Sequence, residues 1–217
     1  MGEDWINIHT HKPGQGINIV DPCLGGIVMP EDGQVYYSMG IHPVYIDGDT
    51  PRRMEEIERA ATEKRIVAIG EAGMDRNAPV GMEVQLEWFE RQARVAGEYG
   101  LPLIIHGVRA IPELISVCKK NGSQNGWIMH GFNNRREILQ DLLRHGFYIS
   151  AGRHVMTEES NLYQLLPEIP VERLFLETDN SDFGIEDIYT RVAERRGESV
   201  EELQRNVRKN FEKLFRI

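Results

Sequence analysis

Short apolar runs rich in β-branched and aromatic residues recur along the chain and predict eight strands. Residues of these types favour the extended, pleated backbone. Several runs are apolar at every position rather than alternating, as expected of a parallel sheet that is covered on both faces. The predicted strands are Trp5–Ile8, Ile17–Val20, Val35–Met39, Ile66–Ile69, Leu103–Ile105, Trp127–Met129, Phe147–Ser150 and Leu174–Leu176.

Amphipathic segments with capping residues lie between the later runs and predict helices. Thr50 and Pro51 are typical of an N-cap and a first helical position, so a helix is expected from there to about Lys64. Ser199 and Glu202 have the spacing of a capping box and predict the start of the last helix. The other helices are expected over Met82–Tyr99, Ile111–Lys120, Asn134–His145 and Ile185–Arg196. Strands that alternate with helices predict an α/β fold, a TIM-like (β/α) barrel formed by one domain over residues 1–217.

The first quarter of the chain departs from this alternation. Only the residues from His9 to Gly16 separate the first two runs. A parallel crossover normally needs a dozen or more residues. The segment from Lys12 to Gln34 is also rich in glycine and proline, which interrupt helices. We therefore expect a distorted barrel with reduced helices in its N-terminal quarter.

Composition limits the possible environments and partners. The net charge of −9 argues against a large basic groove for nucleic acid. Cys23 and Cys118 have neither metal-binding spacing nor a disulfide framework, so they are assigned no chemistry and a reducing cytoplasm is expected. The first residues, Met1 to Asp4, are acidic and do not predict a signal peptide. The sequence predicts no membrane segment, and it predicts no particular oligomer.

Side chains of the kinds that bind metal ions directly follow the predicted strands. Residues just beyond the carboxyl ends of parallel strands share one rim of an α/β fold, where ligands bind. Histidines and carboxylates that meet there would form an active site for one or two divalent cations. The candidate ligands are His9, His11, Glu71, His106, His130 and Asp179.

Each candidate also has a plainer interpretation. His9 and His11 lie two positions apart, so on a strand both face the same way and can reach one ion, but an isolated pair of this kind is also typical of surface or capping residues. Lone histidines such as His106 and His130 often serve as core or capping residues. The metal site is favoured because the same residue type recurs at the same place on successive strands. Glu71, between glycines, can bridge two cations with its two oxygens or be a solvated turn residue, and Asp179 can also be a turn residue.

The motifs, taken in order, resemble those of the TatD-type metal-dependent hydrolases, or TatD DNases, within the wider amidohydrolase-like barrels. The resemblance covers almost the full chain. The motifs that carry it are His9-Thr10-His11, Gly40-Ile41-His42-Pro43, Ile69 to Asp75, Gln85 to Ala96, Pro102 to His106 with Arg109-Ala110, His130-Gly131-Phe132, Leu176-Glu177-Thr178-Asp179, and Asn210 to Phe215.

The resemblance implies a role for each matched position. His9, His11 and Asp179 would bind one metal ion. His106 and His130 would bind a second ion, and Glu71 would bridge the two. His42 and Glu177 match positions close to the site that are implicated in activity, and Arg109 matches an arginine that can contact a phosphate. The implied catalytic residues are thus Asp179, Glu71, Glu177 and His42, with zinc, manganese or magnesium ions, two in number, as cofactors.

Two departures from the family pattern bear on the substrate. The segment Gly107-Val108-Arg109-Ala110 differs from the usual motif after the strand-five histidine. Asn180-Ser181 replaces the usual Ala-Pro after the last aspartate, so different substrate contacts are expected there.

The sequence therefore predicts a metal-dependent hydrolase, a phosphodiesterase or deoxyribonuclease in which metal ions activate water. A small phosphoester or a nucleic-acid end suits the acidic chain better than a long duplex. Two alternatives stay open: a metal-dependent amide or ester (lactone) hydrolase, and a non-catalytic metal-binding scaffold. Outside the site, His145 is expected to cap a helix and His154 to lie on the surface.

Overall fold

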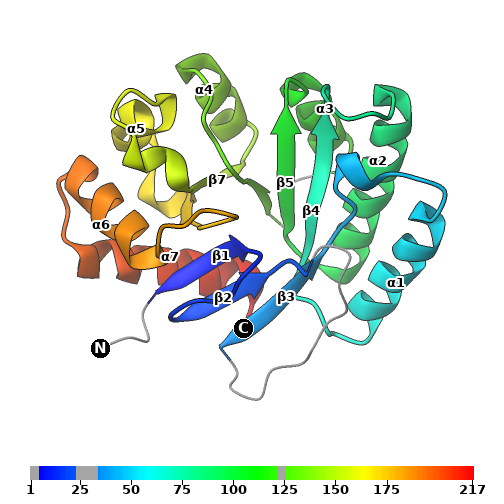
Figure 1. Ribbon diagram of the computed structural model, residues 1–217, viewed down its shortest axis with the longest axis horizontal. Helices are drawn as coiled ribbons and strands as arrows, with labels where there is room; N and C mark the ends of the chain where they lie inside the picture. Colours follow the sequence, from blue (N-terminus) through cyan, green and yellow to red (C-terminus); the bar gives the residue numbers. More distant parts are fainter. Residues whose placement is uncertain (1–4, 23–33, 122–125) are drawn as a thin grey trace.

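Eight parallel strands in sequential order form a nearly closed barrel in this computed structural model, which describes residues 5–22, 34–121 and 126–217. Each strand pairs in parallel with the next one along the chain, and helices surround the strands (Figure 1). The strands are β1 (Ile6–Thr10), β2 (Ile17–Val20), β3 (Val35–Met39), β4 (Ala68–Asp75), β5 (Leu103–Val108), β6 (Trp127–Met129), β7 (Tyr148–Ala151) and β8 (Leu174–Leu176). The predicted α/β barrel is confirmed.

The expected helices are present with small shifts of their ends. They are α1 (Thr50–Thr62), α2 (Met82–Tyr99), α3 (Ile111–Asn121), α4 (Arg136–Arg144), α6 (Ile185–Arg196) and α7 (Val200–Phe215), and α5 (Asn161–Leu165) is an additional short helix. Short 3₁₀ turns occupy Pro43–Tyr45, Arg153–Met156, Leu166–Glu168 and Val171–Arg173. Figure 1 places α1 to α3 on one side of the strands and α4 to α6 on the other.

Capping explains most of the helix ends. Ser199 caps α7 by accepting a hydrogen bond from the backbone N–H of Glu202 at 3.2 Å, as predicted. His145 is the C-cap of α4, also as predicted. Thr50 is the first helical residue of α1 rather than its N-cap, because its hydroxyl accepts from the backbone N–H of Asp47 instead. Two elements differ from expectation: β4 begins at Ala68 and runs on to Asp75, and α5 was not predicted.

The first and last strands meet at one end through polar contacts. Thr10 and Asp179 form an isolated parallel bridge, and the backbone N–H of Asp179 donates to the carbonyl of His9 at 3.0 Å. Below this bridge, Asn7 accepts from the backbone N–H of Thr178 at 3.0 Å and donates to its hydroxyl at 2.8 Å. These contacts close the barrel between its first and last strands. They also hold Asp179, which follows β8, beside His9 of β1.

The N-terminal quarter is reduced where the structure describes it. The connection between β1 and β2 contains no helix. The connection between β2 and β3 includes residues 23–33, which lie outside the described residues, as do Cys23 and the first four residues. Within the described part of the chain, no helix is long and apolar enough to cross a membrane.

The core fills the barrel and the space beneath the helices. Phe89 on α2 is fully buried, and its ring packs edge-on against Trp127 at 5.9 Å between centroids. Asn210 on α7 donates to the carbonyls of Val171 and Leu174 at 2.8 and 3.0 Å, so the C-terminal motif anchors the last helix to the start of β8. Cys118 is buried within α3, and burial raises the pKa of its thiol to about 11, in line with its expected inertness.

Candidate metal centre

All six ligands predicted from the sequence converge at the carboxyl ends of the strands. They surround a cavity of about 300 Å³, hereafter the metal cavity. His9 is fully buried and does not line the cavity itself, but its Nε2 lies 3.6 Å from the carboxylates of Glu71 and Asp179, which do. The residues that line the cavity are His11, Asp21, Gly40, Ile41, His42, Val44, Tyr45, Arg53, Glu71, His106, His130, Asp179 and Asn180.

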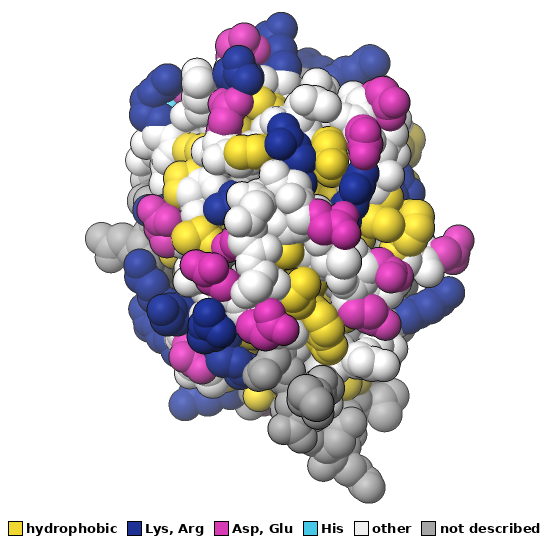
Figure 2. Space-filling model, turned by 90° about the vertical axis from the view of Figure 1, so that its left-hand side faces the viewer, with side chains coloured by type: hydrophobic (Ala, Val, Ile, Leu, Met, Phe, Trp, Pro, Cys, Tyr) yellow, Lys and Arg dark blue, Asp and Glu magenta, His cyan; other side chains and the backbone are white. Residues whose placement is uncertain are grey.

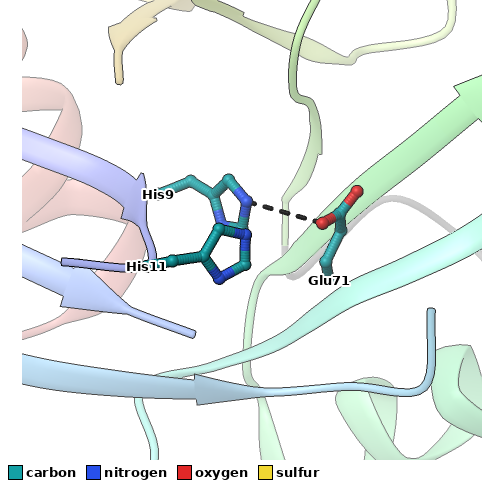
Figure 3. Close-up of side chains that lie close together, drawn as sticks. All are labelled: His9, His11 and Glu71. Atoms are coloured by element: carbon teal, nitrogen blue, oxygen red, sulfur yellow. Dashed lines mark ion pairs between the residues drawn. The ribbon is translucent and has the colours of Figure 1, made fainter. Parts of the chain in front are cut away.

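One group of ligand atoms comes from β1, the residue after it, and β4. Figure 3 shows the imidazoles of His9 and His11 and the carboxylate of Glu71 facing the same space. One ligand atom from each lies within 4.8 Å of the other two. His9 Nε2 lies 3.6 Å from Glu71 Oε2 and 3.6 Å from Asp179 Oδ1, and His11 Nε2 lies 3.4 Å from the same Asp179 oxygen. Thus Asp179 belongs to this group as well.

These separations fit a shared cation. Nitrogen and oxygen ligands about 2.0–2.2 Å from one ion in a tetrahedral site lie roughly 3.3–3.6 Å from each other. His9 supports the same conclusion, because both of its ring nitrogens are buried without a hydrogen-bond partner among the described residues. An unpartnered buried polar atom costs about 1–3 kcal/mol, so its presence needs an explanation such as an ion.

The second group is formed around the other oxygen of Glu71. His106 Nδ1 and His130 Nε2 each lie 2.7 Å from Glu71 Oε1, which is hydrogen-bond distance. His42 Nε2 lies 3.5 Å from the same oxygen. Glu71 therefore divides its oxygens, with Oε2 towards the first group and Oε1 towards the second. A cation between Glu71 and His106 or His130 requires these hydrogen-bonded atoms to separate, so the first group is the better preformed of the two.

Backbone contacts determine which nitrogen of two histidines faces the cavity. His11 Nδ1 lies 2.9 Å from the carbonyl oxygen of Asp21, which only accepts, so in the neutral ring Nδ1 carries the proton and the lone pair of Nε2 can bind an ion. His42 is the opposite case, because its Nδ1 accepts from the backbone N–H of Val44 at 3.1 Å. The proton of the neutral His42 ring is then on Nε2, which makes this nitrogen a hydrogen-bond donor towards Glu71.

Electrostatics in the cluster follow from burial and opposite charges. Burial lowers the pKa of His42 to about 4, so this ring is neutral at pH 7. Burial also opposes a charge on His9, but the carboxylates of Asp179 and Glu71, each 3.6 Å from its Nε2, outweigh this effect and raise the pKa of His9 to about 9. Despite its burial, Glu71 has a pKa well below its ordinary value, because His130, His106 and His9 stabilise the carboxylate. The positive charge on the protonated imidazoles balances the negative charge of the carboxylates. A cation that bound here would take over this balance and release the protons.

Glu177 lies behind His130 rather than at the cavity. Its side chain is 1% exposed and it is not among the lining residues. Its Oε1 accepts from the backbone N–H of Gly131 at 2.7 Å and lies 3.4 Å from His130 Nδ1. A carboxylate in this position orients a ligating histidine through the ring nitrogen that does not bind the ion. Glu177 is close to the site, and its geometry favours a role in positioning His130.

Replacing Glu177 with glutamine is expected to weaken metal affinity or activity by about 10- to 100-fold, the usual effect of losing such a partner. The change keeps the size of the side chain but removes the charge that holds the His130 ring. Metal titration followed by calorimetry, together with the rate of hydrolysis, measures both effects. Exchange of the exposed carboxylate in Glu63→Gln is the matched control. Unchanged metal affinity together with unchanged rate in Glu177→Gln would contradict the positioning role.

Two buried aspartates of the site were missed by sequence reasoning. Asp21 directly follows β2, and its Oδ2 accepts from the backbone N–H of Glu71 at 2.9 Å, so it fixes the central carboxylate. Asp75 ends β4, and its Oδ2 lies 3.1 Å from His106 Nε2. Asp21 carries the same sequence signal as the predicted ligands, because it is a potential metal-binding side chain directly after an apolar run.

Arg109, like Glu177, is a predicted site residue that does not line the metal cavity. Its side chain is exposed and its backbone lies in the left-handed region, at a φ of 54°. Arg53 of α1 is the arginine that lines the cavity. Its guanidinium donates to the carbonyl of Tyr45 and to Asp47, which holds the turn after His42 in place. His154 also lies away from the lining residues, half-buried beside Asn133.

Two buried glutamines of α2 hold separate parts of the rim. Gln92 accepts from the backbone N–H of Ile41 at 2.7 Å and donates to its carbonyl at 3.3 Å, which fixes the residue before His42. Gln85, two turns earlier on the same face, accepts from the N–H of Asp75 at 2.8 Å and donates to its carbonyl at 3.0 Å. The rigid helix thereby sets the positions of His42 and Asp75.

Comparisons with known proteins agree with this geometry. A family model described as "TatD related DNase" matches residues 27–216. The metal-dependent hydrolase YabD of Bacillus subtilis is 29% identical over 199 residues, 84% of this chain and 78% of that protein. The 3'-5' ssDNA/RNA exonuclease TatD of Pantoea vagans is 29% identical over 208 residues, 86% of this chain and 80% of that protein. The crystal structure of the TatD homologue YJJV from Escherichia coli matches the fold with a TM-score of 0.82 at 20% identity, covering 99% of this chain and 98% of that one.

Proposed function

The chain belongs to the TatD-related DNase family of metal-dependent hydrolases, and from this premise we propose that it hydrolyses phosphodiester bonds in a small phosphoester or at a nucleic-acid end. The observation that carries the proposal is the divided carboxylate of Glu71, which turns one oxygen to His9 and the other to His106 and His130. A single barrel domain over residues 1–217 and a cytoplasmic location belong to the same proposal.

We assign His9, His11 and Asp179 to one divalent ion, His106 and His130 to a second, and Glu71 to both. The separations in the first group support its assignment, whereas the second depends on breaking two hydrogen bonds of Glu71. Imidazole-rich ligand sets favour zinc or manganese over magnesium, which prefers oxygen ligands. When bound, such ions lower the pKa of water and neutralise charge on a phosphate.

The side chains divide the remaining chemistry. Asp179 is the ligand carboxylate that is best placed to accept a proton from the attacking water, because its side chain is 30% exposed and that of Glu71 only 9%. Neutral His42 directs its Nε2–H into the metal cavity, where it can donate a hydrogen bond to the leaving oxygen. Arg53 adds a positive charge to the cavity wall, in the role that the sequence suggested for Arg109.

The size and charge of the site support a short, single-stranded end as the substrate. The metal cavity has an apolar wall of Ile41, Val44 and Tyr45, which suits a base or another flat group. On the face shown in Figure 2, basic and acidic side chains are interspersed, without the continuous positive stripe of a duplex-binding groove. The Pantoea relative, named as an ssDNA/RNA exonuclease, supports the same substrate class.

The test compares substrates on protein that has been stripped of metal and reloaded with zinc, manganese or magnesium. The panel holds an end-labelled single-stranded oligonucleotide, the same strand in a duplex, a small phosphodiester and a lactone. We expect metal-dependent cleavage of the single strand, slower cleavage of the duplex, and turnover close to wild type in Arg109→Ala. Cleavage of the lactone without cleavage of any phosphodiester would replace the proposal with an ester hydrolase. Tight metal binding without any turnover would replace it with a binding scaffold.

A further inference from the structure

A second cavity adjoins the metal cavity and shares Asp179 and Asn180 with it. It measures about 290 Å³, which is close to the size of the first. Its other lining residues come from β1, the β1–β2 connection, the segment that leads into α6 and the first turn of α6, and they include Lys12, Gln15, Thr178, Ser181, Phe183 and Glu186. The cavity lies at the rim because the short connection after β1 carries no helix to fill this space.

The lining of this second cavity suits a nucleotide better than an apolar ligand. Gln15, Asn180 and Ser181 bring amide and hydroxyl groups that can pair with base edges and sugar hydroxyls. Lys12 supplies a positive charge for a phosphate from the β1 side, and the negative Glu186 stands on the α6 side. Asn180 and Ser181 occupy the positions at which this chain departs from the family pattern.

Exposed hydrophobic side chains line both cavities. Among the described residues, the large hydrophobic side chains that stand exposed are Val44, Tyr45, Val84, Tyr99, Phe183 and Ile217. Val44 and Tyr45 line the metal cavity and Phe183 lines the second. Both aromatic residues are 43% exposed, so part of each ring is free to contact a ligand. Aromatic faces of this kind stack on the bases of single-stranded nucleic acids.

Both aromatic residues are attached to well-fixed backbone. Tyr45 donates its backbone N–H to the carbonyl of His42 at 2.9 Å, and its own carbonyl is held by Arg53. Its ring lies 5.7 Å from the His42 ring. Phe183 directly precedes Gly184, the N-cap of α6, whose N–H donates to Asp187 at 3.0 Å. A stacking residue on a fixed element loses little conformational freedom when it binds.

We propose that Tyr45 and Phe183 stack on two different bases of a single-stranded substrate, with the scissile phosphate at the metal centre between them, and that the second cavity holds the nucleotide that stacks on Phe183. The inference rests on the proposed function and adds the residues that select a single strand. Unstacked bases are available only in single strands and frayed ends, so a paired duplex cannot occupy both positions.

The test measures binding of a fluorescent thymidine hexanucleotide with slowly hydrolysed phosphorothioate linkages to the zinc-loaded protein. Fluorescence anisotropy gives the dissociation constant for the wild type, Tyr45→Ala and Phe183→Ala. Loss of one stacked base is expected to weaken binding roughly 5- to 100-fold in each variant. Val84→Ala, which removes an equally exposed side chain from α2, is the matched control and is expected to bind as the wild type. Thermal unfolding of each variant checks that the fold is kept.

Abasic positions in the hexanucleotide separate stacking from a general effect. If Phe183 stacks on a base, one particular abasic position weakens wild-type binding but has no further effect on Phe183→Ala. On a cleavable hexanucleotide, both variants are expected to raise KM and leave kcat nearly unchanged. Unchanged affinity in either variant would overturn the two-sided arrangement. If the wild type neither binds nor cleaves the hexanucleotide, the proposed function itself fails, so the two failures are distinguishable.

Discussion

Glu71→Ala is expected to abolish hydrolysis, lowering kcat by at least about 10³-fold. Among the residues that the structure describes, Glu71 is the carboxylate that contacts four histidines, through Oε2 to His9 and through Oε1 to His42, His106 and His130. Its removal therefore disturbs both metal groups at once, whereas loss of any single histidine disturbs one. The measurements are the rate of phosphodiester hydrolysis and the number of bound ions per chain by elemental analysis, which is expected to fall.

A second variant separates loss of charge from loss of fold. Glu71→Gln keeps the shape of the side chain and one oxygen, but removes the negative charge that stabilises the buried imidazoles. Breaking a buried ion pair of this kind costs about 3–5 kcal/mol, so the metal-free variant is also expected to unfold at a lower temperature. Near-ultraviolet circular dichroism shows whether the packed core survives. Full activity in a folded Glu71→Ala protein would contradict the bridging role and, with it, the two-ion assignment.

The positions of the ligands were predictable because they follow from a rule about strands. A side chain that directly follows a parallel strand lies at the carboxyl rim, whatever the details of packing. The sequence alone therefore predicts that His9, Glu71, His106 and Asp179 meet, and the structure places them together. The same rule applies to Asp21, which comes directly after β2 and was overlooked because no motif of the resemblance included it.

The directions and partners of side chains were not predictable in the same way. Arg53 lies on α1 and lines the metal cavity beside the turn at Tyr45. It does not follow a strand, so the rule for strand ends does not predict it as a site residue. Arg109 has the expected position in the sequence, but it lies in an exposed turn with left-handed backbone. Glu177 has the right motif and lies one residue from β8, yet it points behind His130. Such outcomes depend on tertiary contacts that a single sequence does not specify.

Helix α5 is too short to be predicted from the periodicity of hydrophobic residues. Only five residues long, Asn161–Leu165, it is followed at once by a 3₁₀ turn that contains Pro167. Its start is set by Ser160, whose hydroxyl accepts from the backbone N–H of Tyr163 at 3.0 Å. An element of little more than one turn presents too few positions for an apolar stripe to stand out, and tertiary packing of Leu162 and Leu165 supplies most of its stability.

Metal loading is expected to raise the unfolding temperature of the metal-stripped protein by roughly 8–16 °C. A ligand present at 1,000 times its dissociation constant stabilises the native state by about 4 kcal/mol, and each kcal/mol shifts the transition by about 2–4 °C in a chain of this size. The physical reason lies in His9, whose two ring nitrogens are buried without hydrogen-bond partners among the described residues. An ion bound there becomes the partner of one of these nitrogens. The unfolded chain does not bring the ligands together, so the ion stabilises only the folded state.

The rise in unfolding temperature on metal loading is expected to be lost when a ligand is replaced and kept when another residue is replaced. His11→Ala is expected to lose most of it, because His11 Nε2 faces Asp179 in the better preformed group while the ring is only partly buried, so its removal leaves the core intact. His145→Ala, the matched control, also replaces a histidine with alanine, but at the end of α4 and away from the cavity. This variant is expected to keep the full shift. Differential scanning calorimetry with and without chelator gives both values. Equal unfolding temperatures of the loaded and stripped wild-type protein would mean that His9 and His11 hold no ion, because a ligand that binds only the folded chain cannot leave its stability unchanged.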